Sequence, residues 1–160
     1  MKLEIIVIGA GGHATSLAES ILSCGHEILY FVDSYKSYDK LLGYKVLKNI
    51  PKSKSILNIV IAIGDNSKRF EINKIFSNKN LKINFPNIIH SSASVSKFAK
   101  IGPGTVVLQN AVIGANCKIG SFCIINSSSS IDHDCKMSNF SSLGPSSVTG
   151  GNVKIGLRSA

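Results

Sequence analysis

The sequence lacks tryptophan, is short of acidic residues, and has no long hydrophobic run. Its longest apolar stretches, around residues 5–8 and 59–63, are far shorter than the roughly 20 residues that a membrane-spanning helix requires. A strand is predicted to begin within two residues of Met1, which leaves no space for a signal peptide. These absences predict a cytoplasmic protein without membrane insertion.

Cysteine is also scarce, with four in the chain. Three of them, Cys117, Cys123 and Cys135, are separated by 6 and 12 residues, which are multiples of the repeat described below. We therefore predict buried small side chains rather than metal ligands or disulfide partners. Cys24 lies near the end of a predicted helix without a cysteine close to it. No metal site is expected.

The charge balance is strongly positive, with 18 Lys and Arg against 9 Asp and Glu. Such an excess is compatible with nucleic acid, a membrane surface or anionic small molecules as partners. The lysines are interpreted as scattered, as in the pairs Lys52 with Lys54 and Lys97 with Lys100, and they do not alternate with aromatic residues. This favours a phosphate-bearing ligand or a solvated surface, and no nucleic-acid partner is expected.

The most regular feature is a period of six residues that runs from residue 89 to residue 160. Within these twelve hexads the first position is aliphatic except at Thr149, the fifth is small or β-branched, and the second is glycine six times. Glycine there is predicted to serve the corners of the chain. The repeat predicts a parallel β-helix of four coils of 18 residues, each residue lying above its counterpart 18 positions later.

The N-terminal half shows a different pattern. Residues 3–8 are predicted to form a strand, followed by the glycine-rich segment GAGGHA at residues 9–14, a helix over residues 13–23 and a second strand over residues 28–32. A strand, glycine turn and helix make a phosphate-binding unit, because free N–H groups at a helix N-terminus attract anions. In the alternative, the glycines only allow the strand and helix to pack closely.

Asp33 follows the second strand, 24 residues after Gly9, close to the offset at which such folds place a carboxylate on a ribose hydroxyl. A further strand is predicted over residues 59–63, a helix over 67–76 and a short strand over 81–85; residues 34–54 are predicted to be a loop with a strand at 44–47. This is about half of a doubly wound domain, enough for a mononucleotide. Pro86 marks the predicted domain boundary.

One interruption of the repeat carries chemistry, Asp132-His133-Asp134. Histidine is the side chain best suited to take a proton near neutral pH, and a nearby acid can orient it. Because side chains alternate along a strand, both carboxylates are expected on the face opposite His133, unless the corner turns one of them round. The residues stacked on His133 offer no hydrogen bond, so an orienting group would come from another subunit. Its stacked neighbours Ala115 and Gly151 are small and are predicted to leave space for a ligand. The alternative is an ordinary surface histidine.

Taken together, these segments resemble the left-handed β-helix sugar acetyltransferases, specifically the group of sialic acid O-acetyltransferases and nucleotide-aminosugar N-acetyltransferases. The segments that carry the resemblance are GAGGHA, Val32-Asp33, the run from Ile61 to Asn66 with Arg69, and Ile131-Asp132-His133-Asp134.

The resemblance implies an α/β N-terminal Rossmann-like half-domain followed by an all-β left-handed parallel β-helix of hexapeptide repeats. Residues 1–86 would bind a nucleotide sugar, and residues 87–160 would be the acyltransferase β-helix, C-terminally truncated because such proteins continue for further coils. A homotrimer is implied, with the donor acetyl-CoA in the groove between neighbouring β-helices.

The resemblance also implies the roles of individual residues. His133 would be the general base with Asp134 beside it, the acceptor would attack the thioester directly, and a backbone N–H would stabilise the oxyanion. The sugar or nucleotide would be bound by Gly11, Gly12, His13, Asp33, Gly64 and Asn66.

The sequence leaves the acceptor open between an amine and a hydroxyl, and between a sialic acid and a nucleotide-linked aminosugar. Two other functions are also considered: a non-catalytic nucleotide-sugar-binding or scaffold protein, and a fragment of an NAD(P)-binding oxidoreductase.

Overall fold

The computed structural model describes residues 2–51, 56–78 and 81–160, and divides into two compact units, Met1–Pro86 and Asn87–Ala160. Lys52 and Lys54, two of the lysines interpreted as scattered, lie outside the described residues. Among the described residues, the helices are too short to traverse the apolar interior of a bilayer.

The first unit is built on a six-stranded sheet of order β3-β4-β2-β1-β5-β6 within the described residues. Every neighbouring pair is parallel except β3 with β4. The central strand β1 is apolar on both faces, because the successive residues Ile5 and Ile6 point to opposite faces and are both buried, as expected for a sheet covered on both sides. The strands are β1 (Glu4–Ile8), β2 (Glu27–Val32), β3 (Lys40–Leu41), β4 (Tyr44–Leu47), β5 (Leu57–Ile61) and β6 (Ile83–Asn84).

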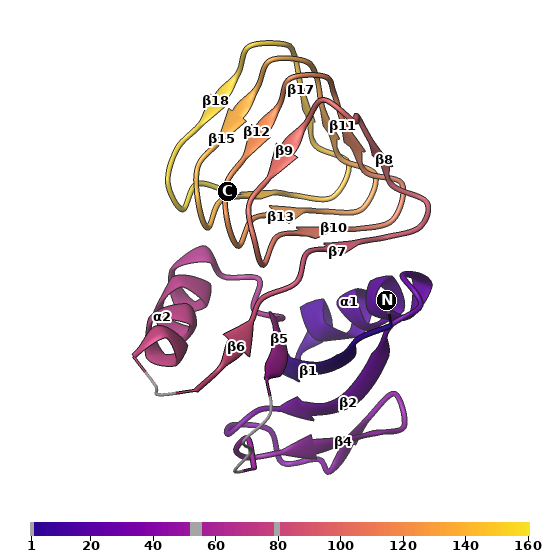
Figure 1. Cartoon of the computed structure of the whole chain (residues 1–160), viewed down its shortest axis with the longest axis vertical. Helices are drawn as coiled ribbons and strands as arrows, with labels where there is room; N and C mark the ends of the chain where they lie inside the picture. Colours follow the sequence, from indigo (N-terminus) through magenta and orange to yellow (C-terminus); the bar gives the residue numbers. More distant parts are fainter. Residues whose placement is uncertain (1, 52–55, 79–80) are drawn as a thin grey trace. The chain divides into compact units, whose positions relative to one another are not determined.

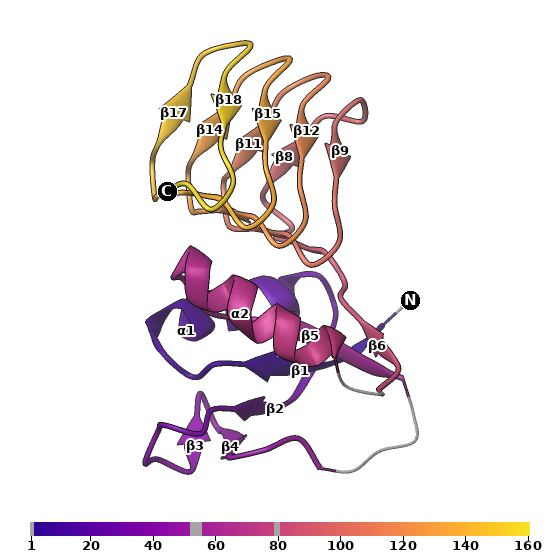
Figure 2. The same cartoon turned by 90° about the vertical axis from the view of Figure 1, so that its left-hand side faces the viewer.

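Two helices, α1 (Gly12–Ser23) and α2 (Asn66–Ser77), connect β1 to β2 and β5 to β6. These connections leave the centre of the sheet in opposite directions, so right-handed crossovers place the helices on opposite faces (Figures 1 and 2). Helix α1 buries Leu17, Ala18 and Ile21 and is followed by Gly25 with φ +75°. Both helices agree with the predicted ranges to within one residue at each end.

The first unit departs from the prediction at three places, one of which is the strand predicted over residues 81–85, which is limited to β6 (Ile83–Asn84). The short strand β3 falls inside the predicted loop, where it pairs with β4 at the edge of the sheet. The strand predicted over residues 59–63 lies two residues earlier, because Ala62, Ile63 and Gly64 leave the sheet to form the loop that precedes α2.

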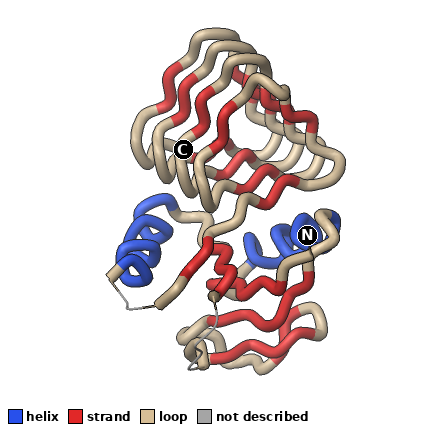
Figure 3. The backbone as a smooth tube through the Cα atoms, in the orientation of Figure 1, coloured by secondary structure: helices blue, strands red, loops and turns tan. Residues whose placement is uncertain are grey.

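The second unit consists of two-residue strands separated by turns, arranged in three parallel sheets of four strands within the described residues (Figure 3). This arrangement is typical of a left-handed β-helix and confirms the predicted architecture. The strands are β7 (Ile88–Ile89), β8 (Ser94–Val95), β9 (Lys100–Ile101), β10 (Val106–Val107), β11 (Val112–Ile113), β12 (Lys118–Ile119), β13 (Ile124–Ile125), β14 (Ser130–Ile131), β15 (Lys136–Met137), β16 (Ser142–Leu143), β17 (Val148–Thr149) and β18 (Lys154–Ile155).

The stacking register is 18 residues, as predicted: Ile113 pairs with Ile131, and Ile119 with Met137. The aliphatic and small columns together form the buried core, which includes the three repeat cysteines. The fifth-position side chains also donate hydrogen bonds to carbonyl oxygens of the next coil. The donors and acceptors are Thr105 Oγ1 to Gly120 O (2.8 Å), Cys117 Sγ to Asp132 O (2.9 Å), Cys123 Sγ to Ser138 O (3.2 Å) and Cys135 Sγ to Gly150 O (3.2 Å).

The expectation that second-position glycines form the corners is wrong. The corner residue with positive φ is at the fourth position, for example Asn116 (+59°), Asp134 (+59°) and Asn152 (+60°). Three of the second-position glycines, Gly102, Gly114 and Gly120, instead allow the next coil to approach closely. A Cβ added to Gly102 would lie 2.7 Å from a backbone nitrogen of the next coil, and one added to Gly114 would lie 2.8 Å from the nitrogen of His133.

One sheet of the β-helix carries a column of positive charge. Strands β9, β12, β15 and β18 each begin with a lysine, and these lysines pair in register; we call Lys100, Lys118, Lys136 and Lys154 the lysine ladder. The corresponding positions of the other two sheets hold serine or aliphatic residues. The interpretation of the lysines as scattered is therefore wrong for these four, which recur at every third hexad.

Candidate active site

His133 lies in the turn between β14 and β15, where its backbone is held from both sides. Its carbonyl oxygen accepts a hydrogen bond from the nitrogen of Asn152 in the next coil (3.0 Å). The nitrogen of the following residue, Asp134, donates to the carbonyl oxygen of Ala115 in the preceding coil (2.9 Å). The position of His133 is therefore set by hydrogen bonds within the β-helix, the kind of rigid support that a catalytic side chain needs.

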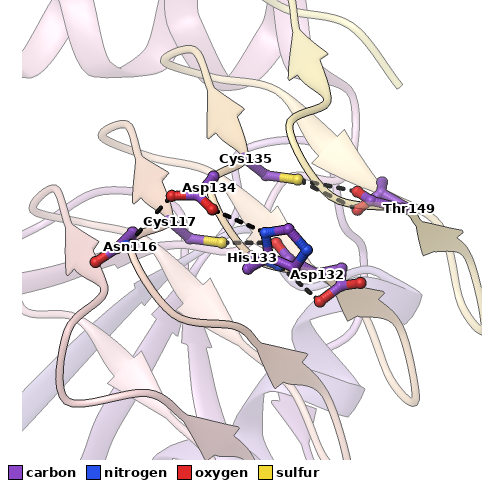
Figure 4. A network of polar contacts seen from close by, with 8 residues as sticks. Asn116, Cys117, Asp132, His133, Asp134, Cys135 and Thr149 are labelled. Carbon is purple, nitrogen blue, oxygen red and sulfur yellow. Dashed lines mark hydrogen bonds and ion pairs between the residues drawn. The ribbon is translucent and has the colours of Figure 1, made fainter.

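The imidazole is oriented by its own chain. Asp134 Oδ2 lies 2.8 Å from Nδ1 of His133 (Figure 4). Of the two arrangements left open, the corner turns Asp134 round, because its φ of +59° takes it out of extended geometry and directs its side chain toward its neighbour. Within this chain the histidine already has an orienting group.

This contact defines the protonation of the ring. An ionised carboxylate only accepts hydrogen bonds, so Nδ1 carries the proton and Nε2 keeps the lone pair that can accept another. The hydrogen bond to Asp134, and then the negative charge of Asp132, raise the pKa of His133 above its ordinary value. The side chain is 54% exposed, so a substrate can reach it. The arrangement suits a general base.

The two carboxylates have different roles. Asp132 Oδ1 accepts a hydrogen bond from the backbone nitrogen of His133 (2.7 Å) and thereby supports the turn rather than the ring. Asp134 has a second partner, because Asn116 Nδ2 in the preceding coil donates to its Oδ1 (3.3 Å). Its hydrogen bonds with His133 and then with Asn116 lower the pKa of Asp134 below its usual range, so it stays ionised.

Gly151 lies against the face of the imidazole. A Cβ at this residue would be 2.6 Å from both Cε1 and Nε2 of His133 and 3.1 Å from Nδ1. The prediction that small neighbours leave space for a ligand is therefore wrong on this side, because the ring itself takes the space. The absence of a side chain at Gly151 is what allows the ring to adopt this orientation.

The thiol of Cys117, which contacts the backbone of Asp132, is not suited to nucleophilic catalysis. It is buried and donates a hydrogen bond to Asp132 O (2.9 Å), and burial is the main cause that raises its pKa. Thiolates rather than thiols attack carbonyl carbons, so a buried thiol of raised pKa is inert. Among the described residues, no group of three or more His, Cys, Asp or Glu residues could hold a metal ion.

In the first unit, the glycines of GAGGHA have two different functions. Gly9 has φ +103°, and a Cβ there would lie 2.7 Å from Ile63 Cδ1 and 2.9 Å from Ala62 O, so its smallness serves packing. Gly11 and Gly12 have nothing within 4 Å of an added Cβ. The packing explanation therefore applies to Gly9, whereas Gly11 and Gly12 face open space at the start of α1.

The N-terminus of α1 has no side-chain cap, since Gly11 occupies the N-cap position. By contrast, the N-cap residue of α2, Asp65, accepts a hydrogen bond from the nitrogen of Lys68 (2.8 Å). An uncapped helix start can offer backbone N–H groups and a partial positive charge to an anion. Of the two helices, α1 therefore has the N-terminus better suited to a phosphate.

Asp33 sits at the end of β2, as predicted, but its carboxylate is already bound to the backbone. Oδ2 accepts from the nitrogen of Ala10 (3.0 Å), and Oδ1 accepts from Tyr35 (3.0 Å) and Lys36 (3.3 Å). Two carboxylate oxygens offer about four acceptor sites, so one remains for a ligand. Asp33 therefore has a structural role, because its hydrogen bond from Ala10 fixes the glycine loop against the end of β2.

A buried arginine organises the loop after β5. Arg69 is 1% exposed, and its guanidinium donates to the carbonyl oxygens of Ile63 (2.8 Å) and Gly64 (3.0 Å) and to Asn66 Oδ1 (2.6 Å). Asn66 was predicted to contact the substrate, but its side-chain oxygen accepts a hydrogen bond from Arg69 inside the protein. Asn66 supports the loop through Arg69 and is itself buried.

His13 points from the start of α1 toward this loop, and its Cβ is 4.0 Å from the position of an added Cβ on Gly64. Burial, and then the positive charge of Arg69, lower the pKa of His13 to about 4. Its Nε2 is buried without a hydrogen-bond partner among the described residues. Such an atom costs free energy unless a ligand or water satisfies it.

Two adjoining hollows lie where β2 and β5 end, against α2, and both include Asp33, Tyr35 and Ile63. Asp33 is the only predicted substrate-binding residue in their linings. Gly11, Gly12, His13 and Gly64 gather instead beside α1. The six predicted residues therefore do not form one site. Four of them lie near α1, Asp33 lies in the two hollows, and Asn66 is hydrogen-bonded inside the protein.

Sequence reasoning missed two residues that shape these sites, Asn116 and Tyr38, and it did not predict the structural role of Arg69. The Tyr38 hydroxyl donates to the carbonyl oxygen of Ala10 and so holds the glycine loop from its other side. No motif marks Tyr38. Asn116 could have been found, because it stands 18 residues before Asp134 in the stacking register.

Two protein families match the chain, one in each of its two units. The PglD N-terminal domain family matches residues 4–76, and the bacterial transferase hexapeptide (six repeats) family matches residues 92–127. No curated protein sequence matches the chain.

Solved structures cover nearly the whole chain. PerB from Caulobacter crescentus, in complex with CoA and GDP-perosamine, is 30% identical with a TM-score of 0.84, and the match covers 97% of this chain and 75% of that one. The acetyltransferase domain of PglB from Neisseria gonorrhoeae is 30% identical with a TM-score of 0.85, over 94% of this chain and 75% of that one. The same domain in complex with acetyl coenzyme A is 29% identical over 96% and 76%.

A structure of GDP-perosamine N-acetyltransferase from C. crescentus with CoA and GDP-perosamine, in a histidine-to-alanine variant, matches with a TM-score of 0.85 at 29% identity. Identity of 30% over three quarters of the relatives' length, together with the two domain matches, exceeds a likeness of fold alone. The chain therefore belongs to the hexapeptide-repeat sugar acetyltransferases with a PglD-type N-terminal domain, the family of the nucleotide-aminosugar N-acetyltransferases.

Proposed function

We propose that this protein transfers the acetyl group of acetyl-CoA to the amine of a nucleotide-linked aminosugar, with His133 as general base. The observation that carries the proposal is the exposed imidazole whose Nδ1 is held by Asp134 at 2.8 Å, leaving Nε2 to accept a proton. The named activities of the relatives favour an amine over a hydroxyl. Transfer to a sialic acid hydroxyl stays a prediction.

The proposed reaction is direct. The amine nitrogen attacks the thioester carbonyl carbon while Nε2 of His133 takes the proton that the nitrogen loses. The tetrahedral intermediate then collapses, the carbon–sulfur bond breaks, and the proton passes from His133 to the departing CoA sulfur. Asp134 stabilises the imidazolium between these two proton transfers, the usual role of an acid paired with a catalytic histidine. A covalent acetyl-enzyme is not needed, and the buried Cys117 offers no nucleophile for one.

The acceptor nucleotide is proposed to bind the first unit. Gly11 and Gly12 would let a phosphate approach the N–H groups at the start of α1, and the unpartnered Nε2 of His13 would bond to the same ligand. Asp33 and Gly64 would shape the site, while Asn66 would act indirectly through Arg69.

The predicted homotrimer is retained as part of the proposal, with acetyl-CoA between neighbouring β-helices. Static light scattering should give a mass of three times 17.0 kDa. A monomeric mass with full activity would contradict a donor site shared between subunits.

Replacing His133 by alanine tests the function. Loss of a general base should lower kcat by about a hundredfold or more, measured as CoA release with a panel of nucleotide-linked aminosugars and sialic acids. His90→Ala is the matched control, since that histidine bonds to Ser92 within its own turn. Full activity of folded His133→Ala would refute the role of the base. Nucleotide-sugar binding without transfer by the wild-type protein would instead support a non-catalytic binding protein.

A further inference from the structure

The side chain of Asn116 lies one coil away from the proposed catalytic pair and contacts its acid. Asn116 occupies the corner between β11 and β12, 18 residues before Asp134 in the stacking register. Its Nδ2 donates to Oδ1 of Asp134 (3.3 Å), while Oδ2 of the same carboxylate lies 2.8 Å from Nδ1 of His133 (Figure 4). Each oxygen of Asp134 therefore has its own partner, and the three side chains form a continuous chain of hydrogen bonds.

The contact with the imidazole does not by itself fix the carboxylate of Asp134. The terminal torsion of an aspartate side chain is broad, so a carboxylate can rotate about a single contact. The side chains of His133 and Asp134 are 54% and 43% exposed, and water competes with an ion pair of this exposure. A second contact, from the other oxygen to a different coil, restricts this rotation and keeps Oδ2 directed at the imidazole.

Positive charges lie close enough to draw an unrestrained carboxylate elsewhere. Asp134 borders a groove whose lining also includes three members of the lysine ladder, Lys100, Lys118 and Lys136. Within the described residues, Asp134 forms an ion pair with His133 and with none of these lysines. Asn116 lines the same groove, and its neutral amide holds Oδ1 without cancelling the charge that stabilises the imidazolium.

We propose that Asn116 is a positioning residue of the reaction, which acts through Asp134 by fixing its carboxylate against Nδ1 of His133. The carboxylate, so held, keeps the proton of the neutral ring on Nδ1 and leaves Nε2 to accept the proton of the acceptor amine. Asn116 itself does not need to touch either substrate. This inference rests on the proposed function and adds a third side chain to its catalytic pair.

The variant Asn116→Gly removes the amide and retains the corner, because glycine adopts the φ of +59° without strain. Its kcat should fall about tenfold, the scale of one coupling within a hydrogen-bond network, while the KM values of both substrates should stay the same. Asn110→Gly is the matched control, because Asn110 occupies the same hexad position with φ +57° at another corner. Its kcat should equal that of the wild-type protein.

A double-mutant cycle separates a role through Asp134 from an independent role of Asn116. In a protein that already carries Asp134→Asn, the further change Asn116→Gly should not lower kcat again. An equal loss in that background would overturn the inference, as would an unchanged kcat in the single variant or a loss confined to KM. Urea unfolding curves establish that folded proteins are compared.

Titration of the imidazole tests the same contact without turnover. The pKa of His133 is followed by NMR of the ring protons, with His133→Ala to assign the signal. Because the released carboxylate moves away from Nδ1, this pKa should fall in Asn116→Gly toward its value in Asp134→Asn. A pKa equal to that of the wild-type protein would overturn the inference. If the wild-type protein transfers no acetyl group, the proposed function fails, whereas this titration still decides whether Asn116 positions Asp134.

Discussion

Replacing Gly151 by alanine should disable the base while leaving the β-helix folded. The new Cβ would lie 2.6 Å from Cε1 and Nε2 of His133, whereas carbon atoms in contact are about 3.5–4.0 Å apart. The ring must therefore move by about 1 Å, which breaks its 2.8 Å hydrogen bond to Asp134. Displacement of a catalytic group by about 1 Å can cost about a hundredfold in rate, or about 2.7 kcal/mol.

The backbone of Gly151 is outside the left-handed region, so alanine introduces no backbone strain there. Its unfolding midpoint in urea should be unchanged or slightly higher, because alanine loses less conformational entropy on folding. Gly150→Ala is the control: it adds the same methyl group one residue earlier, where nothing lies within 4 Å. The measurements are kcat/KM for acetyl transfer and urea unfolding of all three proteins.

The pH profile separates ring displacement from simple obstruction of the substrate. Loss of the Asp134 contact lowers the pKa of His133, so the acid limb of kcat/KM should move to lower pH in Gly151→Ala. An obstructed substrate would leave that limb in place. Full activity of Gly151→Ala, or an equal loss in Gly150→Ala, would refute the reasoning.

Two further predictions concern the acid and the buried arginine. In Asp134→Asn the pKa of His133 should fall toward about 6.5. Since the base works only when neutral, the acid limb of kcat/KM should move to lower pH, and the maximal rate should drop. An unmoved limb would show that Asp134 does not set this pKa. In Arg69→Ala the carbonyl oxygens of Ile63 and Gly64 lose their buried hydrogen-bond donor. The free energy of unfolding, measured in urea, should therefore fall by about 3 kcal/mol. A change below about 0.5 kcal/mol would contradict the structural role of the arginine.

The β-helix could be predicted almost completely from the sequence, because its inward columns follow a strict period. The residues that pack inward are those that a six-residue repeat places there, such as Ile125 and Ile131. The role of the glycines could not be predicted in the same way. The repeat pattern shows that the second position favours glycine. It does not show whether a turn or the close approach of a neighbouring coil is the reason.

The sequence singled out His133 and Asp134 as neighbours in the repeat, but it did not determine whether their side chains meet. Alternation of side chains along a strand separates His133 from Asp134, and the strand rule fails because Asp134 is the corner residue. The lysine ladder was missed for a different reason. Its members are 18 residues apart, so they become visible only when the outward sixth position is compared at every third hexad.

In the first unit, the positions of the elements followed from apolar runs and turn residues, but the side-chain partners did not. Asp33 stands at the expected offset, yet the turn after β2 brings the N–H groups of Tyr35 and Lys36 to its carboxylate. Asn66 likewise bonds to Arg69. Such partners depend on loop conformation, which the local sequence does not determine.

Because corner residues share a left-handed backbone conformation, the histidine–acid contact could be built at another corner of the β-helix. Asn116, one coil below Asp134, has the same φ of +59°, so a His-Asp dipeptide written over Ala115-Asn116 would reproduce the bond between neighbouring side chains. The residue 18 positions after 115 is His133 rather than a glycine, and its side chain would compete for the space beside the new ring. The pair can form at a corner whose fourth residue has a positive φ, and the ring also needs a small residue such as glycine at the stacked position of the next coil.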